Sequence, residues 1–231
     1  MGFLCEKLLK PIPSGEIDNI NVESPIEEYQ PEWLKYAIPV KREDTSGRIS
    51  LFFHGPNKSG KSKLFEKIEK LFEHDVSGVE VGVIYFKTHQ LIKGKDTYLD
   101  FYDIGSFKGN EKDKNWFVER VNLVFIVFDS TSENAVNDIQ RYINKIKNRE
   151  NKDPIKISLW ANKMDLINDN NKIILENVEN NINEYKLYKV NYENNEEIKK
   201  NVIEFIEDNY DEIKDSLHGI DSLDIIDRDL K

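Results

Sequence analysis

The sequence predicts an α/β fold, with a mainly parallel six-stranded sheet, one antiparallel strand and helices on both faces. The first observation is that apolar runs of strand length alternate with stretches of helical period from residue 48 onward. The second is a glycine turn between two adjacent runs, which suits a hairpin. The third is that 39% of the 231 residues are hydrophobic, so the chain can bury a core. Such alternation favours a parallel sheet covered on both faces.

The first expected strand and the first expected helix flank a glycine-containing loop. Residues 49–54 form an apolar run typical of a buried strand. After the loop, apolar residues recur at helical spacing, namely Leu64, Phe65, Ile68, Leu71 and Phe72. Residues 81–92 and 97–102 follow, separated by Gly94-Lys95-Asp96, so we expect two strands that pair antiparallel.

Strands and helices alternate through the second half of the chain. We expect strands at 121–128, 155–160 and 187–190, helices at about 132–148 and 172–183, and a long final helix. Asn194 or Asn195 is the expected cap of that helix, and Gly219 lies past its end. One apolar stripe runs along it and predicts core packing; its members are Ile198, Val202, Phe205, Ile206, Tyr210, Ile213 and Leu217.

The two ends of the chain differ in composition from its middle. Residues 1–47 hold five of the seven prolines and show no sustained period, which predicts an N-terminal extension. Residues 48–217 carry the strand and helix pattern and form the expected main domain. Residues 218–231 hold more acidic than basic side chains, and we interpret them as an acidic C-terminal tail.

Composition excludes several classes of function. A single cysteine rules out an intramolecular disulfide framework and a cysteine-based zinc site, and it favours a reducing, cytoplasmic compartment. The four histidines lack metal-ligand spacing. A net charge of −10 argues against nucleic acid as a partner, because phosphate binding needs a surplus of Lys and Arg. The longest apolar run is far shorter than the about 20 residues of a membrane span.

A phosphate-binding loop (P-loop) is predicted between the first strand and the first helix. Gly55-Pro56-Asn57-Lys58-Ser59-Gly60-Lys61-Ser62 fits the pattern G-x-x-x-x-G-K-[ST]. Backbone N–H groups of such a loop surround the β-phosphate at the helix N-terminus. Lys61, the candidate catalytic residue, reaches the β- and γ-phosphates, and Ser62 ligates Mg²⁺. The candidate nucleotide-binding residues here are Gly55, Asn57, Lys58, Ser59, Gly60, Lys61, Ser62 and Lys63; the alternative is a glycine turn capping an ordinary helix.

A second motif, Asn162-Lys163-Met164-Asp165, directly follows the strand expected at 155–160. With the phosphate loop, it resembles the small GTPases of the Ras and Rab type, whose N-K-x-D motif selects guanine. The Asp165 carboxylate can accept from both the ring N–H and the exocyclic amine of guanine, a pattern that adenine lacks. The resemblance implies that Asn162 braces the loop and contacts the base, and that the stem of Lys163 covers the face of the base.

Spacing extends the resemblance over about residues 48–217. The separations from Lys61 to Asp103 and to Asn162 are similar to those of the family. Asp103 is then the carboxylate that holds Mg²⁺ through a water, and Gly105 meets the γ-phosphate. The stretch Phe128-Asp129-Ser130-Thr131 resembles the Y-D-x-T segment of Rab-like proteins. The family's small GTPase fold is therefore the expected form of this α/β domain.

Two departures from the family pattern predict slow GTP hydrolysis. The family's D-x-x-G-Q motif reads Asp103-Ile104-Gly105-Ser106-Phe107 here, and a phenylalanine cannot orient the attacking water as glutamine does. Asn57 also adds a side chain where many members keep glycine to admit an arginine finger. We therefore expect weak or activator-dependent hydrolysis.

Two further departures concern the first switch and the last base loop. Residues 74–82 contain no threonine for Mg²⁺ and the γ-phosphate, and Ser77 is the expected substitute. The family's S-A-K loop reads Asn191-Tyr192-Glu193. A backbone N–H of this loop can still contact the guanine oxygen, so nucleotide binding is expected to survive more readily than switching.

The N-terminus suggests a lipid anchor. Met1-Gly2 with Cys5 and nearby apolar residues suits a myristoyl and palmitoyl pair, although Glu6 stands where Ser or Thr is favoured. The alternative is a plain start codon followed by glycine. The chain as given ends without a cysteine, so prenylation of the Ras or Rab kind is not expected.

The resemblance implies a Rab-like molecular switch of vesicular traffic that binds GTP or GDP with Mg²⁺. Its expected partners are guanine nucleotide, protein effectors and regulators, and it is monomeric or part of a protein complex in the cytoplasm or on the cytoplasmic face of a membrane. One alternative is a hydrolysis-deficient GTP-binding scaffold, a pseudo-GTPase. An ATP-using kinase is disfavoured because it leaves Asn162 to Asp165 unexplained.

Overall fold

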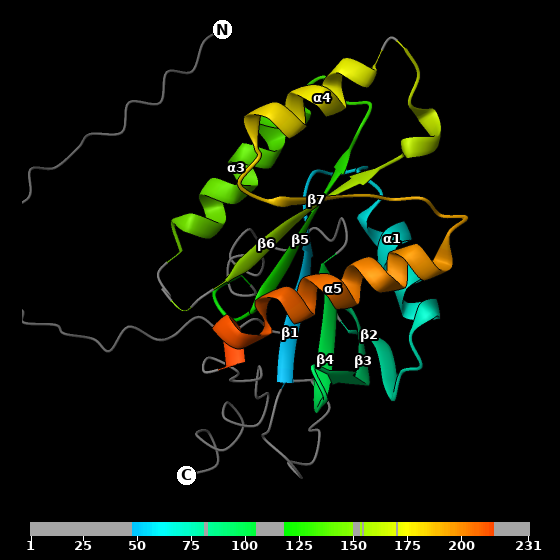
Figure 1. The fold of residues 1–231 in the computed structure, drawn as a ribbon, viewed down its shortest axis with the longest axis vertical. Coiled ribbons are helices and arrows are strands. Elements are labelled where there is room, and N and C mark those ends of the chain that lie inside the picture. Colours follow the sequence, from blue (N-terminus) through cyan, green and yellow to red (C-terminus); the bar gives the residue numbers. More distant parts are fainter. Residues whose placement is uncertain are drawn as a thin grey trace, which may run out of the picture.

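The computed structural model describes residues 48–80, 83–104, 118–149, 153, 155–169 and 171–214 (Figure 1). The expected N-terminal extension with Gly2 and Cys5, the acidic tail, and Gly105 to Phe107 lie outside the described residues. No helix of the described part is long and apolar enough to cross a membrane.

Strands and helices alternate along most of the described chain, apart from the consecutive strands β2, β3 and β4. Their bounds are β1 (Arg48–His54), α1 (Lys61–Leu71), β2 (Val76–Glu80), β3 (Val83–Ile92), β4 (Lys95–Ile104), β5 (Leu123–Asp129), α3 (Ala135–Lys147), β6 (Lys156–Asn162), η2 (Met164–Leu166), α4 (Lys172–Asn181), β7 (Lys186–Lys189) and α5 (Asn195–Ile213). The α/β class is thereby confirmed.

One sheet contains every described strand, in the order β2-β3-β4-β1-β5-β6-β7. The strand β1 pairs in parallel with β4 and β5, and β6 continues the parallel series to β7. Only β3 runs against the others, because it pairs antiparallel with both β2 and β4. The sheet thus has the one reversed strand that was predicted, in a mainly parallel arrangement.

The sheet has seven strands and not the six predicted from the sequence. The additional strand is β2, which pairs with β3 from Val76 opposite Lys87 to Glu80 opposite Val83. Its sequence, with Ser77 and Gly78 in the middle, has no apolar alternation to mark it as a strand. It forms because β3 offers it a ladder of backbone partners.

The predicted hairpin is confirmed by β3 and β4. Their register runs from Val83 opposite Ile104 to Ile92 opposite Lys95, so the turn consists of Lys93 and Gly94 and not of the predicted Gly94-Lys95-Asp96. Both turn residues have positive φ, +47° and +76° respectively, as two-residue hairpin turns require.

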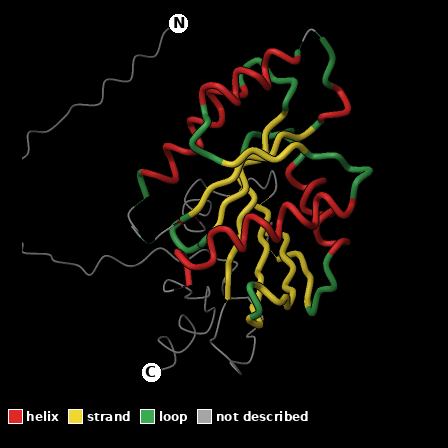
Figure 2. The backbone as a smooth tube through the Cα atoms, in the orientation of Figure 1, coloured by secondary structure: helices red, strands yellow, loops and turns green. Residues whose placement is uncertain are grey.

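Helices cover both faces of the sheet (Figure 2), and two hydrophobic clusters lie between the sheet and these helices. One joins the sheet to α1 and α5, through residues such as Phe65 and Phe205. The other joins it to α3 and α4, through residues such as Ile139 and Val178. The predicted stripe of α5 is buried from Ile198 to Ile213, while Leu217 lies outside the described residues.

The strand β5, next to the central strand β1, is buried on both faces from Leu123 to Phe128. The ring of Phe125 packs against the rings of Phe53, Trp160 and Phe205, with centroids 4.9–5.7 Å apart. These contacts fix the neighbouring strands whose carboxyl ends carry the candidate site.

Candidate functional site

The loop between β1 and α1 follows a backbone path that requires glycine at two positions. Gly55 and Gly60 have φ of +135° and +87°. A Cβ on Gly55 would lie 2.2 Å from the carbonyl oxygen of Val127, and one on Gly60 would lie 2.1 Å from Nδ2 of Asn162. The loop is therefore folded tightly against the ends of β5 and β6, a constraint independent of any phosphate.

Lys61 is the first residue of α1, and its side chain reaches back over the loop. Its Nζ donates to the carbonyl oxygens of Gly55 and Pro56, at 3.1 and 2.8 Å. These bonds place the ammonium group within the curve of the loop, where a lysine of this motif contacts phosphates. Asn57 and Lys58 are exposed at the outer rim, and Ser59 is buried.

Ser62 and Asp103, the two predicted metal ligands, are in direct contact. Ser62 Oγ donates to Asp103 Oδ2 at 2.7 Å. Asp103 is fully buried on β4, opposite Phe53 of β1. A hydroxyl and a carboxylate are hard oxygen donors that fit Mg²⁺, which draws its other ligands from water and phosphate. No group of three or more His, Cys, Asp or Glu side chains in the described residues is placed to hold a metal ion.

Asn162 connects the phosphate loop to the second motif. It is the last residue of β6 and is buried, and its Nδ2 donates to the Ser59 carbonyl oxygen at 2.9 Å. Its Oδ1 accepts from the backbone N–H of Lys163 at 2.9 Å. The bracing role expected for Asn162 thus corresponds to a direct bond between two loops that are far apart in sequence.

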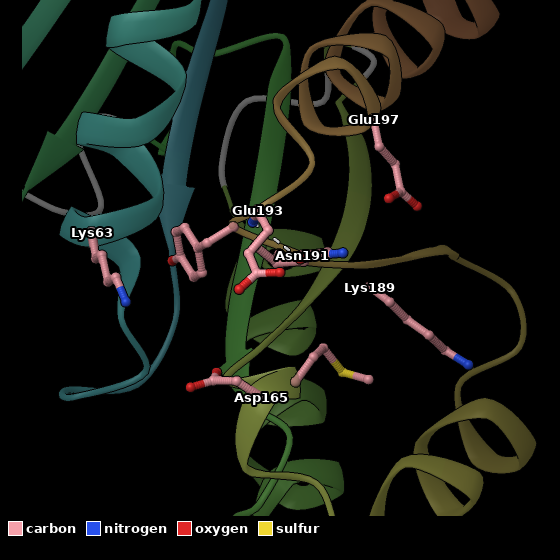
Figure 3. Close-up of a pocket in the computed structure, with 9 residues that line it drawn as sticks. Lys63, Asp165, Lys189, Asn191, Glu193 and Glu197 are labelled. Carbon is pink, nitrogen blue, oxygen red and sulfur yellow. Dashed lines mark hydrogen bonds between the residues drawn. The ribbon is translucent and has the colours of Figure 1, made fainter.

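A pocket of about 580 Å³ lies beside this bridge (Figure 3). Asp165, Asn191 and Tyr192, three of the predicted base-binding residues, meet there with Lys63. Figure 3 shows that they come from separate elements: Lys63 from α1, Asp165 from η2, and Asn191 from the loop after β7. Asp165 is exposed, so its carboxylate is available to a ligand. The remaining lining residues are Met164, Lys189, Val190, Glu193 and Glu197.

The side chain of Tyr192 is a feature of this pocket that the sequence analysis missed. The Lys63 ammonium lies 4.3 Å from the centre of the Tyr192 ring, a cation–π distance. Burial, together with the nearby charge of Asp165, raises the pKa of Tyr192 to about 12. Tyr192 therefore stays neutral at physiological pH. The sequence did contain a signal for this side chain: Tyr192 stands where the family's S-A-K loop has a small residue.

Ser77, the expected substitute for the switch threonine, is the second residue of β2 and lies opposite Phe86. The segment predicted to act as a switch loop is therefore partly a strand. Gly105 falls outside the described residues, so its expected contact with the γ-phosphate remains a prediction.

The family model described as "Ras of Complex, Roc, domain of DAPkinase" matches residues 50–165, half of the chain. The matched range begins in β1 and ends at Asp165, so it contains both the phosphate loop and the N-K-x-D motif. A search of curated proteins finds no significant match. The phosphate loop, its bridge through Asn162 and the family match lead to one conclusion: the chain belongs to the Roc family of Ras-like, GTP-binding P-loop domains.

Proposed function

We propose that the protein is a guanine-nucleotide switch of the small GTPase type that binds GTP or GDP with Mg²⁺ and hydrolyses GTP slowly. The observation that carries this proposal is the 2.9 Å bond from Asn162 Nδ2 to Ser59, which joins the phosphate loop to the loop of Asp165. The bond fixes a phosphate site and a base pocket next to each other. This arrangement suits a ligand that contains both a phosphate group and a base. A nucleotide is such a ligand.

The predicted residues divide into a phosphate-binding, a metal-binding and a base-binding group. Lys61 and the backbone N–H groups of residues 55–62 bind the β- and γ-phosphates. Ser62 and Asp103 would hold Mg²⁺, which neutralises phosphate charge when bound. Asp165 accepts from the guanine edge, Lys163 covers its face, and the backbone at Asn191 and Tyr192 contacts the guanine oxygen. Hydrolysis is slow because Phe107 cannot position a water, and Asn57 stands in the path of an arginine finger.

Replacing Asp165 with asparagine tests the base assignment. An amide at this position can donate to the 2-oxo group of xanthine, but it has one neutral acceptor oxygen in place of the two carboxylate oxygens that accept from guanine. Asp165→Asn should therefore weaken GDP binding by about 100-fold or more and favour xanthosine diphosphate, as measured by competition against a fluorescent nucleotide. Asp169→Asn, at an exposed carboxylate on the same loop, is the control and should keep the wild-type preference. An unchanged preference in the Asp165 variant contradicts guanine recognition.

Nucleotide carried through purification tests the hydrolysis assignment. The protein is denatured immediately after purification, and the released nucleotide is quantified by chromatography. A mixture rich in GTP supports binding with slow hydrolysis, whereas GDP alone indicates efficient turnover and contradicts the slow-hydrolysis proposal.

A second candidate function is a nucleotide-stabilised scaffold without switching. The position of Ser77 within β2 favours it, because a strand residue is less free than a loop residue to follow the γ-phosphate. Hydrogen exchange of residues 74–82 separates the two functions. Different protection with GDP and with a non-hydrolysable GTP analogue supports a switch, and equal protection supports the scaffold.

The cellular setting follows from the same proposal. A Rab-like switch of vesicular traffic acts in the cytoplasm with protein effectors and regulators, and acyl chains on Gly2 and Cys5 would give it a peripheral membrane contact. Metabolic labelling with a myristate analogue, compared with a Gly2→Ala variant, tests this anchor; absence of label contradicts it.

A further inference from the structure

The segment Asp129-Ser130-Thr131, at the carboxyl end of β5, has no role in the function proposed above. It lies beside the N-K-x-D motif, because Asp129 is opposite Asn162 in the β5–β6 register. Its three side chains all take part in hydrogen bonds at this point. The question is therefore what these bonds hold in place.

Ser130 fixes the peptide group that joins Asn162 to Lys163. The backbone N–H of Ser130 donates to the carbonyl oxygen of Asn162 at 3.0 Å, and the buried Ser130 hydroxyl donates to the same oxygen. Lys163 then starts from a left-handed backbone conformation, with φ of +61°, which is uncommon for a residue other than glycine. The direction in which its side chain leaves the backbone is thereby determined.

Asp129 fixes the far end of the same side chain. Its Oδ2 accepts from Lys163 Nζ at 2.5 Å. Its Oδ1 accepts from the backbone N–H and the hydroxyl of Thr131, at 2.9 and 2.7 Å. Thr131 therefore orients the carboxylate so that one oxygen faces the lysine.

The pair is partly shielded from solvent, with 31% of the Lys163 side chain and 23% of the Asp129 side chain exposed. Burial alone would raise the pKa of Asp129, but the hydrogen bonds from Lys163 and Thr131 outweigh it and hold that pKa below its ordinary value. The carboxylate is thus ionised at neutral pH. The Lys163 stem is anchored at both ends, at its backbone by Ser130 and at its ammonium by Asp129.

We propose that Asp129, oriented by Thr131, is a positioning residue that holds the Lys163 stem against the face of the guanine ring and so sets how long the nucleotide stays bound. This inference rests on the proposed guanine site and adds to it a residue that does not touch the ligand. The apolar stem is useful against the base only while the ammonium group is held elsewhere. A lysine released from Asp129 would exchange among rotamers, and its contact with the ring would be lost for part of the time.

The test is the release rate of a fluorescent GDP from the full chain. Asp129→Asn keeps the size of the side chain and an acceptor for Thr131 but removes the negative charge. The release of GDP should become about tenfold faster, because the loss of one partner of a shielded ion pair mainly raises the dissociation rate. The control is Glu184→Gln, which breaks the exposed pair between Glu184 and Lys147, 3.2 Å apart, and should leave the rate unchanged.

A double-mutant cycle separates positioning from a general structural effect. In Lys163→Met the stem remains but has no ammonium group to hold, so adding Asp129→Asn should change release by less than about twofold. If Asp129→Asn accelerates release equally in both backgrounds, it acts through the fold and the inference is wrong. A wild-type rate in the single variant also overturns it, while the proposed guanine site stands. A wild-type protein that binds no guanine nucleotide overturns both.

Discussion

At the scale of single residues, Asn162 restricts which residue can stand at position 60 and holds Ser130 in place. Its side-chain amide nitrogen occupies the space where a side chain on Gly60 would begin, and its backbone carbonyl oxygen accepts from the N–H and the hydroxyl of Ser130. One buried residue thus couples the ends of three segments, through its side chain and its backbone. This coupling holds the phosphate loop against the ends of β5 and β6.

Gly60→Ala is predicted to destabilise the protein strongly. The new Cβ would lie 2.1 Å from Asn162 Nδ2 at a φ of +87°, so the Asn162 bridge must shift. We expect a loss of about 2–4 kcal/mol in the free energy of unfolding, measured by urea denaturation. Gly94→Ala is the matched control: its φ is +76°, but nothing lies within 4 Å of the added atom, so only about 1 kcal/mol should be lost. Equal losses would contradict the bridging role of Asn162.

At the scale of elements, the caps distinguish the two long helices. Asn194 caps α5, since its Oδ1 accepts from the backbone N–H of Glu197 at 3.1 Å and its Nδ2 donates to the Glu197 carboxylate. Asn134 stands at the same place before α3 but makes no capping hydrogen bond through its side chain. Asparagine therefore caps the N-terminus of α5 through its side chain but does not do so at the N-terminus of α3.

Asn194→Ala should lower the free energy of unfolding by about 1 kcal/mol, because an orphan backbone N–H loses its acceptor. The measurement is chemical denaturation followed by circular dichroism. Asn134→Ala, the equivalent change at α3, should have an effect of a few tenths of a kcal/mol. A larger loss at Asn134 than at Asn194 would refute this account of the caps.

The elements also show what the sequence can predict. The stripe of α5 and the hairpin of β3 and β4 follow from periodicity and turn residues, which are local signals. The strand β2 has no such signal, since it is short and carries Ser77 and Gly78, and it depends on pairing with β3. The loop residues of the candidate site can also be recognised from local signals, because each of the two motifs is a continuous stretch of sequence. The contacts between Lys63 and Tyr192 and between Asp129 and Lys163 are not, because each joins residues far apart in the chain.

At the scale of the whole molecule, the candidate site lies at the carboxyl edge of the parallel strands. The strands β1, β4, β5 and β6 run in the same direction, and the phosphate loop, Asp103, Asp129 and Asn162 stand at or next to their ends. Ligands of open α/β sheets bind at this edge. A ligand bound at this edge therefore contacts the ends of several strands, and we expect it to stabilise the entire sheet.

Guanine nucleotide should stabilise the fold as a whole. A ligand that binds only the folded state, at 100 times its dissociation constant, adds about 2.7 kcal/mol to the free energy of unfolding. We expect GDP with Mg²⁺ to raise the midpoint of thermal unfolding by several degrees. ADP with Mg²⁺ at the same concentration should have no effect, and equal shifts would argue against guanine selectivity. Removal of Mg²⁺ by EDTA should reduce the GDP effect.

The seven-stranded sheet ends on its two shortest strands, β2 with five residues and β7 with four. A free strand edge invites pairing with another copy of the same protein, and short, charged edges resist it. The strand β7 begins and ends with lysines, and these are bound to helices: Lys186 to Asp208 at 2.8 Å and Lys189 to Glu179 at 2.9 Å. A second molecule would have to displace these ion pairs before it could extend the sheet, so the β7 edge disfavours self-association into fibrils or edge-to-edge dimers.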